Sequence, residues 1–146
     1  MLTRSTPRGD RGSVLILMPA GVLIVLLLGA IAVDFTVIHL RQRAAISAAA
    51  SAANDAVTYG LDQDALRRGA GYRLDPNRVA RAVAESIDAQ GLAGDLTAPP
   101  EVTEPGPGTV RVVLHVRAAY LFARSLPGAP SGTIVTATAT ATIDQR

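Results

Sequence analysis

The feature that most constrains this chain is residues 13–33, an unbroken run of 21 residues without a charged, amide or imidazole side chain. At a helical rise of about 1.5 Å per residue, this run would be roughly 31 Å long, close to the thickness of a bilayer's hydrocarbon core. Three arginines precede it, Arg4, Arg8 and Arg11. We therefore predict a transmembrane helix at residues 13–38, preceded by a basic tail at residues 1–12.

Two other interpretations of the run have to be weighed. A cleaved signal peptide would also have a basic tail, and Ala30 and Ala32 fit a small-x-small cleavage pattern. A buried core helix is the third interpretation. We favour a retained anchor, because the run is long for a cleaved segment and apolar residues resume at Phe35. Charge asymmetry around the span favours a cytoplasmic tail and an outer domain at the cell membrane.

Composition excludes several classes of function. Residues 34–146 hold eleven arginines against eleven acidic residues, so no basic surface for a nucleic-acid partner is predicted. The chain has no cysteine for disulfides or thiolate metal sites. It also has no lysine for a Walker-type phosphate loop and no G-x-S-x-G motif, so we expect neither a cofactor nor an enzymatic activity.

The remaining ionisable residues offer weak catalytic candidates. His39 and His115 are the only imidazoles. Their places, beside the span and on the polar face of a predicted strand, indicate surface residues. The acidic pairs, which lack metal-ligand spacing or a partner base, are interpreted as solvated loop charges: Asp62 with Asp64, and Glu101 with Glu104.

Residues 39–60 favour continuation of the span as an Ala-rich stalk helix, ended by Gly60. Eight alanines occur between positions 44 and 56, and alanine has the highest helix propensity. Spacings of three and four define an apolar seam that we expect to pack on the chain's own sheet or on a neighbouring copy: Ile46, Ala50, Ala53, Val57 and Leu61. Asp34, at the edge of the span, is a further candidate interface residue, because a carboxylate there needs the headgroup region or a partner.

The outer domain, residues 61–146, is predicted to be α+β. A helix at residues 76–90 begins with Asp75 as cap and stops at Gly91. Alternating patterns at residues 109–117 and 133–143 predict strands, with a third near residues 101–104 in a hairpin. Residues 61–74 read as a short helix or loop, and 118–126 as a short helix or irregular crossover. The expected architecture is a long N-terminal transmembrane and stalk helix on a small antiparallel sheet of about three strands, with one further amphipathic helix. Inward alanines on the last strand leave room for the stalk.

Several of these segments together resemble the TadE/TadG-like proteins of the Flp (Tad) pilus assembly system. The resemblance rests on Arg11-Gly12 before the run, the sequence GAIAVD ending at Asp34, and the Ala-rich helix that contains Asn54. Residues 120–128 and the closing Thr/Ala strand extend it, whereas the middle from about residue 61 to 108 has no counterpart.

The resemblance implies a non-enzymatic, membrane-anchored, pseudopilin-like component whose partners are other pilus or secretion subunits or further copies of itself. Prepilin-type cleavage would fall between Gly12 and Ser13. Processed relatives carry a glutamate at the fifth residue after the cut, where this chain has Leu17. The departure points to the unprocessed, TadG-like members. A secreted or anchored ligand- or envelope-binding domain with a cleaved signal peptide is the alternative, and a hydrolase is third.

Overall fold

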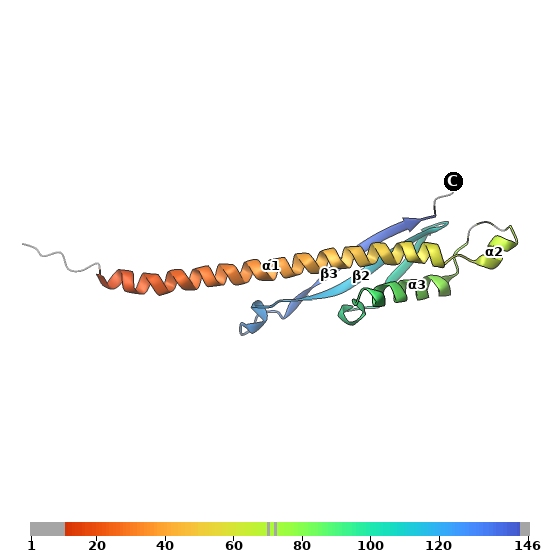
Figure 1. The fold of residues 1–146 in the computed structure, drawn as a ribbon. Helices are drawn as coiled ribbons and strands as arrows, with labels where there is room; N and C mark the ends of the chain where they lie inside the picture. The colour runs from red at the N-terminus through yellow and green to blue at the C-terminus, as the bar shows by residue number, and fades with distance from the viewer. Residues whose placement is uncertain (1–10, 70, 72, 144–146) are drawn as a thin grey trace, which may run out of the picture.

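One helix runs most of the length of the molecule (Figure 1). The computed structural model describes residues 11–69, 71 and 73–143, with side chains from Leu17 onward, so the predicted tail at residues 1–10 lies outside the described residues. The helix α1 (Arg11–Tyr59) has 49 residues and continues through Pro19. Its N-terminal part stands alone, whereas its C-terminal part lies against the other elements (Figure 1). Anchor candidate and domain are therefore joined by one continuous helix.

Gly60 ends α1, as the sequence predicts. Its N–H donates to the carbonyl oxygen of Ala56 at 2.9 Å. A Cβ at position 60 would collide with that same oxygen and would lie 2.5 Å from Cγ2 of Val79. The glycine is therefore needed because the last carbonyl groups of α1 and the side chain of Val79 in α3 both lie where a Cβ would be, and a left-handed backbone is not involved.

The sheet has three antiparallel strands in the order β1-β2-β3, which confirms the predicted α+β fold. The strands are β1 (Glu101–Gly106), β2 (Thr109–Ala119) and β3 (Gly132–Thr142). Strands β2 and β3 pair in continuous register from Thr109 opposite Thr142 to Ala119 opposite Gly132. The hairpin between β1 and β2 turns at Gly108, whose φ of 65° is in the left-handed region that glycine adopts without strain.

The core forms where α1 lies against β2 and β3, with α3 (Pro76–Ala89) packed beside α1 (Figure 1). Alanines supply the α1 side of this contact and branched residues supply the β2 side. The buried members are Ala45, Ala48, Ala49, Ala52, Ala53 and Ala56 of α1, Val110, Val112, Leu114 and Val116 of β2, Ala137 of β3, and Val79, Val83 and Ile87 of α3. The inward alanines of β3 do face the Ala-rich helix, as predicted. The segment at residues 39–60 is thus the centre of the domain core.

The predicted apolar seam of α1 is divided between the core and the exposed side of the helix. Ala53 is buried and Val57 packs against the core, but Ala50 is exposed and Ile46 keeps 48% of its surface exposed. The buried stripe is instead the set of six alanines, which also recur at spacings of one, three and four. The sheet approaches too closely for a face that includes Ile46, because small side chains are what permit such close packing.

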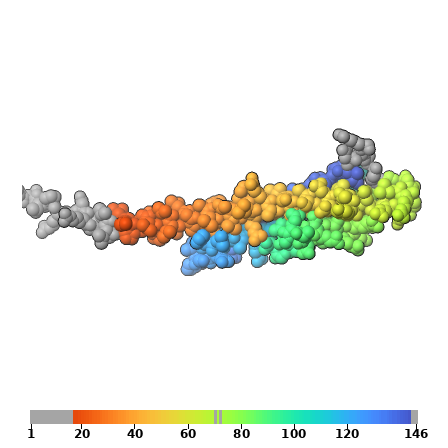
Figure 2. Space-filling view, in the orientation of Figure 1, coloured from red at the N-terminus to blue at the C-terminus, as the bar shows by residue number. Residues whose placement is uncertain are grey.

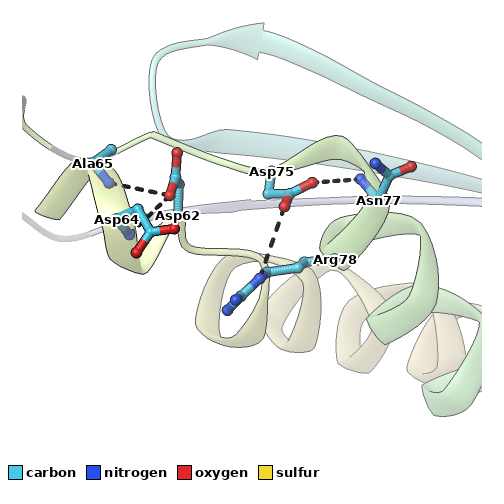
Figure 3. A network of polar contacts seen from close by, with 6 residues as sticks. All are labelled: Asp62, Asp64, Ala65, Asp75, Asn77 and Arg78. Carbon is cyan, nitrogen blue, oxygen red and sulfur yellow. Dashed lines mark hydrogen bonds and ion pairs between the residues drawn. The ribbon is translucent and has the colours of Figure 1, made fainter.

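The chain between α1 and α3 contains one short helix, α2 (Gln63–Arg67), in the region predicted as a short helix or loop. The carboxylate of Asp62 caps it by accepting hydrogen bonds from the N–H groups of Asp64 at 2.9 Å and Ala65 at 3.1 Å (Figure 3). The hydrogen bond from Ala65 lowers the pKa of Asp62, and the bond from Asp64 acts in the same direction.

Helix α3 begins and ends where its sequence signals predict. The carboxylate of Asp75 accepts from the N–H of Asn77 at 2.9 Å, Pro76 occupies the first turn, and Arg78 lies 3.8 Å from the same carboxylate (Figure 3). After Ala89 the chain turns through Gly91, whose φ is 68°. These are an N-cap and a glycine C-terminal stop of the ordinary kind.

Candidate functional site around Asp34

The N-terminal part of α1 presents apolar side chains to its surroundings. Among the described residues, α1 is the one helix long and apolar enough to cross a membrane, and almost none of its most apolar stretch is covered by the rest of the chain. Side chains at Leu23, Val25, Leu26 and Leu28 are all more than half exposed. The interpretation of residues 13–33 as a buried core helix is therefore wrong.

Asp34 lies at the point where this exposed run meets the domain, and only 7% of its surface is accessible. Its Oδ1 accepts hydrogen bonds from the backbone N–H groups of Leu121 at 2.7 Å and Phe122 at 3.1 Å, and its Oδ2 accepts from that of Ala123 at 2.9 Å. Hydrogen bonds from N–H groups to an ionised carboxylate are roughly twice as strong as neutral ones. The arrangement therefore holds three successive amides on one side chain.

The partner of Asp34 is the connection between β2 and β3, residues 120–131, which we call the β2–β3 loop. Its 3-10 turn η2 (Ala123–Ser125) lies in the region predicted as a short helix or irregular crossover. The first N–H groups of such a turn have no partner within it, and they need an acceptor from elsewhere. Asp34 supplies that acceptor from a position 87 residues earlier in the chain. Asp34 therefore caps this turn from a distant segment of the same chain.

The β2–β3 loop extends along α1 from Asp34 toward the N-terminal part of the helix. In Figure 2 the blue atoms of the loop lie against the orange part of α1, while the red part stands free. An apolar hollow of about 290 Å³ separates the two, lined by Leu27, Ala30, Ile31 and Asp34 of α1 and by Phe122, Ala123 and Leu126 of the loop. The loop thus covers one side of the last two turns of the apolar run.

A second contact ties α1 to the domain about two turns further on. Nη1 of Arg41 lies 2.7 Å from Oδ2 of Asp95, in the short turn η1 (Ala93–Asp95). Both side chains are more than a third exposed, so the ion pair adds little to stability. Together with Asp34 it fixes the face of α1 that looks toward the domain.

The structure separates the predicted interface residues into two groups. Asp34, Ala53 and Val57 are engaged within the chain. Ile46 and Ala50 lie on the exposed side of α1, where another molecule could reach them. Gly12 and Ser13 fall in the first turn of α1, whose side chains lie outside the described part of the chain.

The histidines lie apart from this site. His39 is exposed on α1. His115 lies on the open face of the sheet, with Nδ1 3.1 Å from Oγ1 of Thr136 and Nε2 3.5 Å from Oε1 of Glu101. Glu101 and Glu104 both belong to β1 and are exposed, so their interpretation as loop charges is wrong, whereas the prediction of a third strand near residues 101–104 is correct. In the described ranges no three acidic or imidazole groups are placed to hold a metal ion.

Sequence reasoning identified Asp34 but not its partner. The signal was a carboxylate at the end of an apolar run, which requires compensation. Nothing in the sequence of residues 121–123 indicates that their backbone N–H groups bind a carboxylate, because every residue other than proline carries such a group. Comparison of the chain with protein-family models, with curated proteins and with solved structures gives no match.

Proposed function

We propose that this chain is a structural, non-enzymatic assembly component, pseudopilin-like, of a Tad/Flp-type pilus or a related secretion apparatus. It is held in the cell membrane by the N-terminal part of α1, with its tail in the cytoplasm and its α+β domain outside. Its partners are other subunits of the apparatus and further copies of itself, and nucleic acid is not among them. The observation that carries the proposal is the single helix that serves as both anchor candidate and domain core.

A continuous helix suits a subunit that must pack in a fixed orientation. At the helical rise, 49 residues give a rod of roughly 74 Å. A ligand-binding domain on an anchor gains nothing from such rigidity, since a flexible linker would serve it equally well. A subunit that stacks against identical neighbours needs the domain held at one distance and one angle to the membrane.

The exposed side of α1 offers a surface for such packing. Ile46 is a large apolar residue that the chain leaves uncovered outside the membrane segment, and Ala50 lies one turn further along the same side. Helices associate through faces that combine apolar and small residues, because small residues allow close approach. These two residues are the proposed contact with a partner helix.

Retention of the anchor is supported by the β2–β3 loop. Leu27, Ala30 and Ile31 line the hollow beneath the loop. A signal peptidase cut that left a protein beginning at Val33 would remove all three from beneath Phe122 and Leu126. The loop would then lose the surface that it covers, so the geometry favours an uncleaved chain.

One observation favours the alternative, a small ligand- or envelope-binding domain. A hollow of about 300 Å³ lies between α3 and the β1–β2 hairpin, lined by Thr103 and Glu104 and by six apolar residues: Leu74, Pro76, Val79, Ala80, Val102 and Val110. This volume is at the lower limit for small-molecule pockets. The alternative requires binding at this hollow and requires no contact through Ile46.

The test combines fractionation with crosslinking in cells. The protein should remain with membranes after carbonate extraction and should keep the sequence before Ser13. A photo-crosslinking residue at position 46 or 50 should yield an adduct with a second copy or an identified pilus or secretion subunit. The same residue at Thr138, exposed on the open face of β3, is the matched control. A soluble protein beginning at Val33, or an anchored protein without adducts from positions 46 and 50, would refute the proposal.

A further inference from the structure

We propose that the β2–β3 loop is itself a membrane-inserting element, whose apolar tip enters the interfacial layer of the lipid bilayer beside α1. The inference rests on the anchoring role proposed for α1 and adds a second membrane contact to it. The contact is made by residues 121–126, and the partner is the outer leaflet. Four independent features of the described residues support this assignment.

The first feature is the exposure of the loop tip. Leu121, Phe122 and Leu126 keep 46%, 51% and 56% of their surface accessible, whereas Ala123 is half-buried and lines the hollow against α1. Neighbouring side chains of the apolar run, Ile31 among them, are equally exposed. Loop and helix therefore form one continuous apolar surface. Such a surface in water would carry a large free-energy cost, whereas lipid already covers the helical part of it.

The second feature is the length of the run that the loop leaves free. The loop reaches along α1 as far as Leu27. If the loop stood wholly in water, residues 13–26 alone would have to cross the bilayer, about 14 residues or roughly 21 Å. The hydrocarbon core is about 30 Å thick. The span becomes long enough only when residues 27–33, and the loop beside them, lie within the membrane.

The third feature is the match in depth. From Leu27 to Asp34 the helix rises roughly 10 Å, which is the depth to which interfacial elements insert their apolar side chains. Backbone amides at such a depth need acceptors within the protein. The carboxylate of Asp34 accepts from the N–H groups of the three residues that lead into the tip. The contact thus removes the polar cost that would otherwise keep this loop in water.

The fourth feature is the kind of residue that gathers at this level. Phe35 follows Asp34, and Tyr120 and Phe122 lie in the loop, so three of the five aromatic residues of the sequence occur here. Aromatic side chains are enriched where membrane meets water. Arg124 is exposed at the tip, and its long side chain can reach lipid phosphates while its stem stays in the apolar layer. No other part of the described chain combines these groups.

The same surface could in principle be covered by a second copy of the chain. The bilayer is favoured because the tip is continuous with a surface that lipid must cover in every anchored state, including a single subunit before assembly. A second copy would have to displace lipid from that surface. A probe attached to the loop distinguishes the two occupants, because lipid would quench it in the first case and a probe on a second copy would exchange energy with it in the other.

The chain has no cysteine, so single cysteines can be introduced and labelled without a background. Phe122→Cys and Leu126→Cys in the full chain would carry an environment-sensitive fluorophore, in vesicles of phosphatidylcholine and phosphatidylglycerol. Val25→Cys marks the anchor and Thr138→Cys marks the open face of β3. Lipids brominated near the headgroup should quench roughly half of the loop emission, as expected within the upper 5–10 Å of the leaflet. The Thr138 probe should be unaffected, and the Val25 probe should be quenched by bromines deeper in the chains.

Each result has one meaning. If Val25 is not quenched, the anchoring proposal fails. If Val25 is quenched and both loop probes behave as Thr138 does, the anchor stands and the loop inference is overturned. Energy transfer between loop probes on two copies, without lipid quenching, would assign the surface to self-association and also overturn it. A lipid-soluble photolabel applied to the unmodified chain should modify residues 121–126 and avoids any effect of the substitutions on folding.

Discussion

The close contact between α1 and the sheet gives a prediction with a control built into the same helix. Ala53 is 1% exposed in the core, whereas Ala50, three residues earlier, is exposed. Replacing Ala53 by leucine adds three carbon atoms to a close-packed site. Overpacking of this kind typically costs about 1 to 3 kcal/mol of unfolding free energy. Ala50→Leu should change it by less than about 0.5 kcal/mol, as surface substitutions usually do.

Hydrogen exchange of the full chain in detergent micelles measures the difference. The amides of Val112, Leu114 and Val116 lie on the buried strand β2, so their slowest exchange reports opening of the domain. A loss of 1 to 3 kcal/mol should accelerate that exchange roughly 5- to 150-fold for Ala53→Leu. Equal exchange in the Ala53→Leu and Ala50→Leu variants would refute the packing of the Ala-rich segment as the origin of domain stability.

Three further predictions address single contacts. Asp34→Asn keeps one acceptor oxygen but places an NH2 group against the N–H of Ala123, so exchange in the β2–β3 loop should accelerate while β2 stays protected; an unchanged loop would contradict the cap. Gly60→Ala should lower the unfolding free energy by about 1 to 3 kcal/mol, measured by denaturant unfolding, because its Cβ would collide with the carbonyl oxygen of Ala56 and with Val79. The pKa of Asp62 lies below its ordinary value of 3.8, so the stability that this cap gives α2 is present above that pH and is lost as the pH falls through the lowered pKa. In the Asp62→Asn variant the side chain still caps α2 but does not titrate. The acceleration of amide exchange in α2 at low pH, measured by NMR, should therefore disappear.

The sequence predicted elements whose signals are local. Asp75 and Gly91 mark the ends of α3 because capping and left-handed turns depend on a few neighbouring residues. The alternation along β2 and β3 identifies both strands, since a half-buried strand exposes every second residue. The uncharged run identifies α1 as a candidate span, because it too is a local signal carried by consecutive residues.

What could not be predicted depends on contacts between distant segments. A helix rich in alanine offers several equivalent faces, so spacing alone could not decide whether Ile46 or Ala49 faces the sheet. The contact of Asp34 with Phe122 joins residues 88 apart and uses backbone amides, which leave no mark in the sequence. Candidate interface residues were therefore named on both sides of α1, and the structure leaves Ile46 and Ala50 as the ones that a partner could reach.

The absence of any break in α1 across the described boundary between anchor candidate and domain has a mechanical consequence. A helix without a flexible joint transmits any tilt of its membrane-spanning segment to the sheet. About 36 residues separate the middle of the span from Tyr59, roughly 54 Å of helix. A tilt of about 10°, well within the range that bilayers impose on single helices, would swing that far end by roughly 9 Å. Membrane thickness and neighbouring helices, which set the tilt of the span, would then set the position of the outer domain as well.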